Sequence, residues 1–253
     1  TVSGAAAYNN SYEASSVQAF AAAGDPSLLR VAQVDYVKPE QMQSQEFGYR
    51  GKLSRTFTVD AAVYRNDFQD FINTQVVLSP LYGEVGDGGL SVLAMANGDF
   101  ETWSSYTNSP AEISSWGVSI GAQTKIFGNF DLSANYTKSK LEFEQSLYPD
   151  FRTNWNTPEH KIKAQFGNTQ LFENFGFNVA WRYWSEYLWQ ASFGDGMVPE
   201  THVIDAQFNL TVPKWKSVIK VGATNLGGEE YFTAFGSGFI GTQYYISWTA
   251  NNF

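Results

Sequence analysis

The chain has no cysteine, only two histidines and no long apolar run. Without cysteine it forms no disulfide, no thiolate metal site and no thiol nucleophile. No segment approaches the ~18 consecutive apolar residues of a membrane-spanning helix, which excludes a helical membrane protein. Basic residues are also few. The 16 Lys and Arg against 25 Asp and Glu give a net charge of −9, which argues against nucleic-acid binding.

Alternation of apolar and mainly polar residues is what the sequence has instead. Between Thr201 and Val212 one set of alternate positions is apolar, with Ile204, Ala206, Phe208, Leu210 and Val212, and the other set, from Val203 to Thr211, is mainly polar. The same period of two recurs in residues 47–53, 115–126, 175–183 and 216–225. A period of two indicates β-strands with two different faces. The alternation alone does not tell whether the apolar face meets a protein core or lipid.

The connections between these strands alternate between short and long. Short connections lie near residues 54–56, 127–129, 168–174 and 213–216, and long ones cover 9–42, 79–112, 140–158, 185–200 and 227–240. This parity is typical of an antiparallel up-and-down transmembrane β-barrel, with turns in the periplasm and long loops outside. A ten-residue strand such as 216–225, tilted by about 40°, spans roughly 26 Å, close to the ~25 Å apolar band of such barrels. The sequence therefore predicts an all-β barrel in a Gram-negative outer membrane, with a periplasmic C-terminus.

Aromatic residues make up 17% of the chain and fall at predicted strand ends and in the long loops. Two interface girdles explain part of this distribution. The aromatic residues on the long-loop side could also form a stacking surface for a sugar, an aromatic chelate or a peptide. These ligand-binding candidates are Trp103, Tyr106, Tyr148, Trp155, Trp184, Tyr187 and Trp189. In residues 185–200 the aromatic run is followed by Gly194-Asp195-Gly196, which predicts a loop able to close over a ligand.

Catalytic and metal-binding patterns are weak. His160 and His202 begin strands separated by one other strand, so their backbones are predicted to lie ~10 Å apart and to form no metal site. His202 and Asp205 could be combined with a serine into a Ser/His/Asp arrangement, but no nucleophile-elbow or other local motif supports one. Residues 83–89 lack phosphate-loop and calcium-loop spacing and are predicted to be a flexible loop. We expect no catalytic residue, no metal and no cofactor, and hence a protein that is not an enzyme.

Four segments, in order along the chain, resemble motifs of TonB-dependent outer-membrane receptors. Residues 38–51 are similar to the family pattern Lys-Pro-Glu followed by Ser-x-Glu-x-Gly-Tyr-x-Gly. Residues 59–72 resemble a tyrosine-containing strand that ends in Asp-Phe-Ile. Residues 156–161 resemble a Thr-Pro-x-His-Lys strand start, and residues 223–231 resemble the Asn-Leu motif before the last strand. Together the four segments extend across nearly the whole chain.

The resemblance implies a 22-stranded barrel with an N-terminal plug that imports a scarce nutrient, such as a siderophore, a glycan or a peptide, energised through the TonB system. We count nine full strands and the end of a tenth at residues 1–8. Residues 1–253 are thus expected to be the C-terminal part of that barrel, with the plug absent from this chain. The implied partners are outer-membrane lipid, TonB through the absent plug region and a small-molecule, glycan or peptide substrate; a surface lipoprotein is a further option.

The last strand departs from the usual pattern. Tyr244, Ile246 and Trp248 occupy the register opposite to the one counted back from Phe253, and a bulge near residues 251–252 would reconcile the two. One alternative also remains open at this point: a complete ten-stranded outer-membrane enzyme of the omptin protease kind, because its strand count matches ours.

Overall fold

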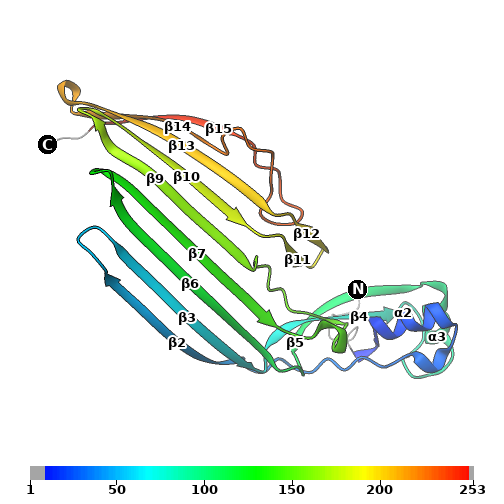
Figure 1. The fold of residues 1–253 in the computed structure, drawn as a ribbon. Coiled ribbons are helices and arrows are strands. Elements are labelled where there is room, and N and C mark those ends of the chain that lie inside the picture. The colour runs from blue at the N-terminus through cyan, green and yellow to red at the C-terminus, as the bar shows by residue number, and fades with distance from the viewer. Residues whose placement is uncertain (1–8, 251–253) are drawn as a thin grey trace. The chain divides into compact units, whose positions relative to one another are not determined.

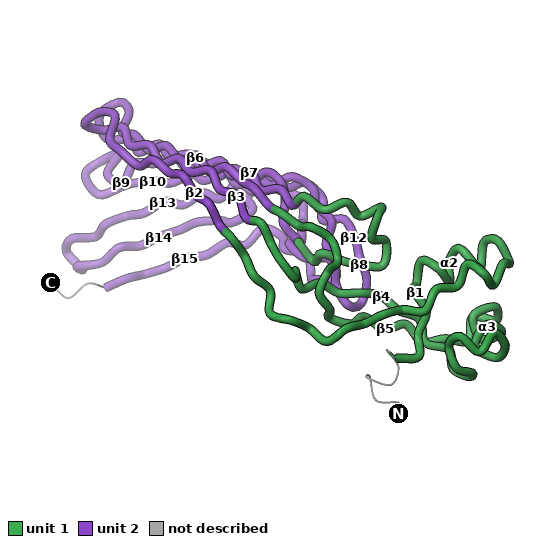
Figure 2. Tube along the Cα trace, turned by 90° about the horizontal axis from the view of Figure 1, so that it is seen from below, with its two compact units in different colours: residues 1–43, 67–114, 142–155 green, residues 44–66, 115–141, 156–253 purple. Residues whose placement is uncertain are grey.

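A computed structural model describes residues 9–250, and the chain divides into two compact units (Figure 2). Unit 1 comprises residues 1–43, 67–114 and 142–155. Unit 2 comprises residues 44–66, 115–141 and 156–253. The described part contains no helix that is long and apolar enough to cross a membrane.

The main sheet is a nine-stranded meander (Figure 1). Its strands in spatial order are β2 (Gln41–Lys52), β3 (Thr58–Gln69), β6 (Ile113–Ile126), β7 (Phe130–Glu142), β9 (His160–Phe172), β10 (Phe175–Trp184), β13 (Thr201–Val212), β14 (Ser217–Thr224) and β15 (Gln243–Ala250). Spatial order follows chain order, which confirms the predicted up-and-down antiparallel fold and its nine full strands. The predicted tenth strand at residues 1–8 and the predicted bulge at 251–252 lie outside the described residues.

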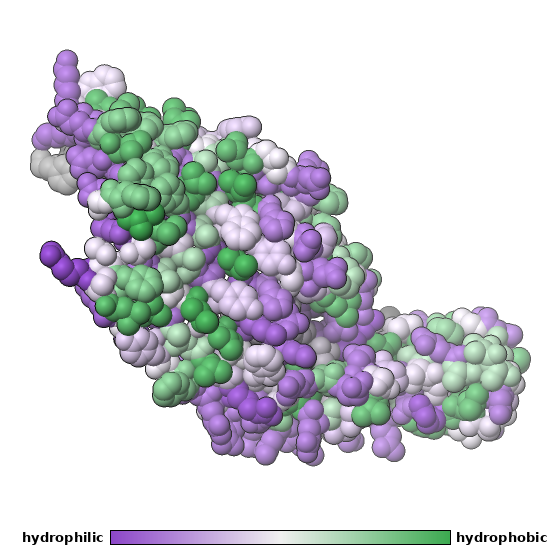
Figure 3. All heavy atoms as spheres, viewed as in Figure 1, coloured by the Kyte–Doolittle hydropathy of each residue, from purple (hydrophilic) through white to green (hydrophobic). Residues whose placement is uncertain are grey.

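The strand register collects apolar side chains into lateral rows. Phe208 of β13 lies opposite Phe177 of β10 on one side and Val221 of β14 on the other, and Val221 lies opposite Ile246 of β15. Three of these side chains are exposed, Phe208 at 53%, Val221 at 49% and Ile246 at 76%. Figure 3 shows apolar side chains gathered over the short-turn end of the sheet. The apolar face of the sheet therefore covers no protein core, as a face that meets lipid requires.

The other face of the sheet carries polar rows. Gln207 lies opposite Asn178 and Gly222, and Gln165 lies opposite Ser133 and Ala180. The glycine of one row is covered by an aromatic ring, because a Cβ on Gly222 would overlap the ring of Tyr245. The Tyr245 hydroxyl donates a hydrogen bond of 2.9 Å to Gln207 Oε1. Rings above glycines fill a strand position that has no side chain of its own.

The short and long connections alternate as predicted. The short connections are residues 53–57, 127–129 and 173–174 and the 3₁₀ turn η3 (Pro213–Trp215). The long connections are residues 70–112, 143–159, 185–200 and 225–242. Two predicted boundaries were wrong. β9 continues to Phe172 through the predicted turn at 168–174, with a register shift opposite residues 175–177. The predicted strand at 59–72 stops at Gln69, because Asp70 takes a positive φ of 51°, and Ile72 begins another strand.

Unit 1 is built mainly from long connections that the sequence indicated only as loops. Its elements are β1 (Tyr12–Glu13), α2 (Ala14–Ala23), η1 (Pro26–Leu28), β4 (Ile72–Pro80), α3 (Leu90–Asn97), β5 (Phe100–Asn108), η2 (Gln145–Leu147) and β8 (Phe151–Arg152). β4 is central and pairs with β1, β5 and β8. A core of Tyr12, Val17, Phe20, Leu78 and Met95 joins the two helices to β4. Unit 1 thus has a water-shielded core of its own.

Carboxylates fix the two helices of unit 1. α2 is rich in alanine, a strong helix former, and ends where Gly24 takes the left-handed conformation, φ 70°. At its other end, the Ser15 backbone N–H and hydroxyl both donate to Asp150, at 2.6 and 2.7 Å. Before α3, Asp87 accepts hydrogen bonds from the Gly89 N–H at 2.9 Å and the Ser91 hydroxyl at 2.8 Å. The predicted loop at residues 83–89 is therefore organised around one carboxylate.

Candidate ligand-binding site

The long connection at residues 185–200 forms a β-hairpin of β11 (Tyr187–Ala191) and β12 (Gly194–Val198), in which Trp189 lies opposite Gly196. Two hydrogen bonds hold its first strand: the Asn156 amide donates to the Gln190 carbonyl at 3.0 Å, and the Gln190 N–H donates to Asn156 Oδ1 at 2.7 Å. Gly194 and Gly196 belong to the paired part of the hairpin. The glycines that we predicted to let this loop close over a ligand thus lie inside a regular β-hairpin.

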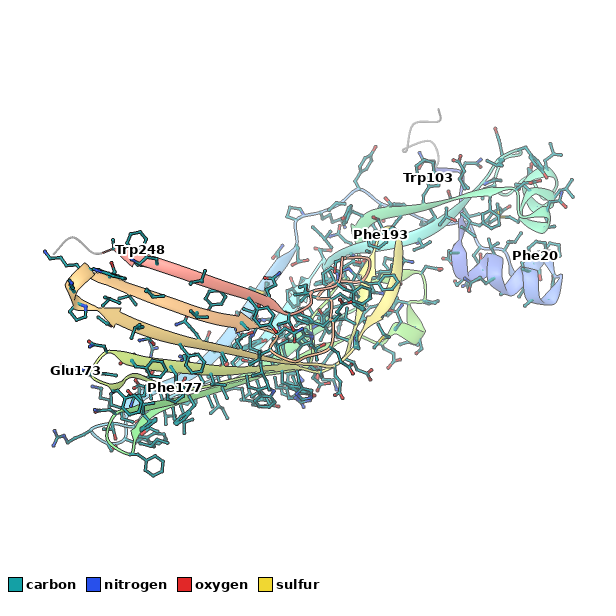
Figure 4. All side chains as sticks on the ribbon, turned by 90° about the horizontal axis from the view of Figure 1, so that it is seen from above. Phe20, Trp103, Glu173, Phe177, Phe193 and Trp248 are labelled. Carbon is teal, nitrogen blue, oxygen red and sulfur yellow. The ribbon has the colours of Figure 1, made fainter. Side chains whose placement is uncertain are left out.

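The hairpin is also joined to the connection between β14 and β15. The Tyr187 hydroxyl donates a hydrogen bond of 2.7 Å to the carbonyl of Thr233. A Cβ on Gly196 would overlap the ring of Phe235, and a Cβ on Gly236 would lie 2.8 Å from the ring of Phe193. Phe193, at the turn of the hairpin, is labelled in Figure 4. Each connection therefore places a phenylalanine ring above a glycine of the other. A closing motion of this hairpin remains a prediction, and it would carry both connections together.

A cavity of about 250 Å³ lies beside this hairpin, within unit 2. Its lining includes Lys161 and Lys163 from β9, Arg182 and Trp184 from β10, and Tyr187 from β11. Burial raises the pKa of the Tyr187 phenol above its ordinary value, so the group stays neutral and keeps its hydroxyl proton. The site combines aromatic surface with three cations, an arrangement suited to holding a small polar ligand.

The charges of this cavity are unevenly balanced. Arg182 forms an ion pair of 2.9 Å with Asp205. Lys163 lies directly opposite Arg182 in the register, and Lys161 lies opposite Trp184. On the other side of β9 their neighbours are Asn135 and Thr137. The carboxylate of Asp205 thus neutralises Arg182, one of the three cations that line the cavity.

The structure brings three of the seven predicted residues together. Trp184 and Tyr187 line the cavity, and the Trp189 ring lies 6.4 Å from that of Tyr187. The other four belong to unit 1. In β5, Trp103 lies opposite Val77 of β4, and Tyr106 is exposed. Tyr148 stacks on Phe143 at 5.9 Å, and Trp155 is the last residue of the segment 142–155. A ligand-binding role for the seven remains a prediction.

Sequence reasoning missed the cations Lys161, Lys163 and Arg182. One signal was present, because Lys161 and Lys163 occupy successive polar positions of an alternating strand. Their approach to Arg182 depends on a register between strands that periodicity does not give.

The two histidines lie on the face of the sheet that carries the apolar rows. His160 Nδ1 is 2.8 Å from the Tyr136 hydroxyl, and the His202 ring stacks on Trp181 with centroids 5.9 Å apart. Within residues 9–250, no group of three or more His, Asp or Glu side chains is placed to hold a metal ion. Both residues pack as interface side chains do.

Comparisons with known proteins agree on the fold. The family model "TonB dependent receptor-like, beta-barrel" matches residues 3–226. Similar solved structures include the copper transporter OprC, at 15% identity and a TM-score of 0.59, covering 84% of this chain and 31% of that one. The siderophore receptor PirA from Acinetobacter baumannii has 15% identity, a TM-score of 0.56 and coverages of 84% and 32%. The FrpB iron transporter from Neisseria meningitidis has 13% identity, a TM-score of 0.58 and coverages of 85% and 31%.

No curated protein sequence matches the chain. The chain spans about a third of the length of each similar structure, and at these identities the likeness shows the fold alone. The family match rests on the sequence itself and extends over most of the residues, from the segment before α2 to the end of β14. The chain therefore belongs to the family of TonB-dependent receptor β-barrels.

Proposed function

We propose that this chain is the C-terminal part of a 22-stranded outer-membrane receptor that imports a scarce nutrient, energised through the TonB system. Receptors of this family are outer-membrane proteins. Its structural neighbours include a copper transporter, an iron transporter and a siderophore receptor, which puts a metal chelate among the substrates to test, beside glycans and peptides.

The observation that carries the proposal is the two-faced sheet. One face presents apolar rows such as Phe177, Phe208, Val221 and Ile246, whereas the other presents charged and amide side chains such as Lys163, Gln165 and Arg182. A wall with lipid on one side and a polar interior on the other accounts for both faces. The candidate cavity lies at the end of β9 and β10 near the long connections, and its lining includes Lys161, Lys163 and Arg182 of the polar face.

The proposed orientation places the long connections outside the cell and the short ones in the periplasm, which is the sidedness of barrels of this kind. Arriving substrate would then meet the aromatic residues of the long connections, among them Trp184, Tyr187 and Trp189. The proposed partners are TonB, reached through a plug region that these residues do not contain, and outer-membrane lipid around the apolar face; a surface lipoprotein at the long-connection end remains an option.

The alternative of a ten-stranded omptin-like protease has less support. The family model that matches residues 3–226 is that of a receptor barrel. We assign no catalytic residue, because the His202 ring packs on Trp181 and Tyr183 and the Asp205 carboxylate is engaged by Arg182.

Depletion of compounds from the growth medium tests the proposal. Cells with and without the full-length protein that contains this chain would be grown in the same nutrient-poor medium, each with and without a protonophore. We expect at least one compound to disappear only when the protein is present and the inner-membrane gradient is intact. Depletion that persists under the protonophore would indicate a passive pore and contradict the proposal.

A double substitution tests the aromatic residues. Tyr187→Ala with Trp189→Ala in the same protein should weaken binding of that compound by about tenfold or more, because each lost stacking contact is worth ~1 kcal/mol. The heat-modifiable migration of the barrel should be unchanged. An unchanged affinity would remove this hairpin from the proposed site.

A further inference from the structure

The cavity beside the β11–β12 hairpin, lined by Lys161, Lys163 and Arg182 of neighbouring strands, is rich in hydrogen-bond donors. Lysine and arginine side chains donate and do not accept. The side-chain amide of Asn156 both donates to and accepts from the backbone of Gln190, and the Tyr187 hydroxyl donates its proton to the Thr233 carbonyl. A ligand in this cavity would therefore meet hydrogen-bond donors and positive charge.

Two of these donors lack an acceptor. Arg182 Nε and Trp184 Nε1 are buried, and neither has a hydrogen-bond partner among residues 9–250. Both residues lie on the same side of β10, two positions apart. A buried donor without an acceptor costs free energy, so its persistence in a site calls for an explanation. Both residues line the cavity, so acceptor oxygens of a bound ligand would lie beside these donors.

The cations themselves repel one another. Lys163 lies directly opposite Arg182, and like charges at directly opposite strand positions destabilise a sheet. In the part of the chain that the structure describes, Lys161 and Lys163 form no ion pair, and the carboxylate of Asp205 is held by Arg182 and by the N–H of Asn225 at 3.1 Å. Lys161 and Lys163 thus add two positive charges to the cavity that no ion pair of the described residues offsets.

We propose that this cavity binds an anionic ligand with several acceptor oxygens, of the polycarboxylate or polyphosphate class, between Lys161, Lys163, Arg182 and Trp184. The inference rests on the proposed receptor function and names the charge of its substrate. Bound oxygens would pair the two lysines, accept from Arg182 Nε and Trp184 Nε1, and remove the repulsion across β9 and β10.

Binding of citrate and of pyrophosphate to the purified full-length protein tests the charge of the ligand, with sucrose as a neutral probe. The variant is Lys161→Met with Lys163→Met. The matched control is Lys220→Met. Lys220 belongs to β14, lies on the same polar face of the sheet, and has Asn209 and Ser247 as its neighbours on the adjacent strands. We expect saturable binding of at least one anion, weakened tenfold or more in the double variant, and unchanged in the control.

Three outcomes would overturn the inference: neither anion binds saturably, both bind the double variant as tightly as the native protein, or sucrose competes equally well. A second readout is independent of the probes. Lys163→Met should raise the unfolding temperature of the ligand-free barrel because it removes the repulsion with Arg182, whereas a lysine that only supports the structure should lower it. A neutral compound that is depleted in the energised manner described above would leave the receptor function standing and refute the anionic substrate.

Discussion

Units 1 and 2 place apolar residues according to opposite rules. In unit 1, Phe20 is 6% exposed and packs with Leu78 and Met95 in a closed core, as in a water-soluble domain. In unit 2, Phe208 and Ile246 lie on the surface of a single sheet. Their charges differ as well, because unit 1 carries 14 acidic and 3 basic side chains, whereas unit 2 carries 11 acidic and 13 basic ones. One chain thus combines a part suited to water with a part suited to lipid.

The largest expected effect comes from the same substitution in the two units. Phe20→Ala leaves a cavity in a closed core and should cost unit 1 about 3–5 kcal/mol. Phe208→Ala leaves no enclosed cavity on a lipid-facing surface and should cost about 1 kcal/mol, for the ring pair with Phe175 at 5.7 Å. Hydrogen exchange over residues 12–24 reports on the first and thermal unfolding of the barrel on the second. Equal costs would contradict the two-solvent comparison.

A charge placed on each face of the sheet sharpens the comparison. Val179→Arg, in an apolar row between Phe166 and Ala206, should destabilise the barrel by roughly 2–4 kcal/mol at midplane depth. Gln165→Arg, at an exposed position of the polar face, should be much milder. Gly222 is unsuitable as the polar-face control because the ring of Tyr245 covers it. Refolding into lipid measures both variants, and similar losses would argue against a lipid-facing row.

A smaller effect is expected at the start of α2. Asp150→Ala removes the acceptor of two hydrogen bonds from Ser15 and should destabilise the helix by about 1–2 kcal/mol. Asp25→Ala, at the exposed start of η1, is the control and should matter less. Proteolysis near residues 14–23 measures both. Faster cleavage in the Asp25 variant than in the Asp150 variant would refute the helix-capping role.

The smallest expected effect is a pH dependence in unit 1. The Gly89 N–H and the Ser91 hydroxyl, as hydrogen-bond donors, hold the pKa of Asp87 below its ordinary value of 3.8. A lowered pKa means that the carboxylate stabilises the folded turn above pH 3.8, and that this contribution is lost as the pH falls through the folded pKa. Amide exchange at the start of α3 should therefore accelerate only below about pH 4. Acceleration near neutral pH would point to another group.

The sequence was more informative about the lipid-facing part than about unit 1. The predicted strand at Thr201–Val212 has the bounds of β13, because a strand with a different environment on each face shows a period of two. Unit 1 gave no such pattern. Its core joins Phe20 to Leu78 and Met95 across more than fifty residues, and the polar Asn73 and Gln75 are buried in β4. Contacts of that separation are set by packing, which local periodicity does not encode.

The candidate site divides in the same way. The aromatic residues Trp184, Tyr187 and Trp189 could be chosen from composition and loop position alone. The meeting of Lys163 with Arg182 could not, since it depends on which residues of β9 and β10 pair. A slip of one residue would have sent these side chains to opposite faces.

The reciprocal seating of Phe193 above Gly236 and Phe235 above Gly196 also limits how this surface can be exchanged between proteins. If residues 185–200 alone were grafted onto another barrel, Phe193 would lack the glycine over which its ring packs, and Gly196 would lack the ring that covers it. The connections at 185–200 and 225–242 should therefore be inherited, and transplanted, as a pair.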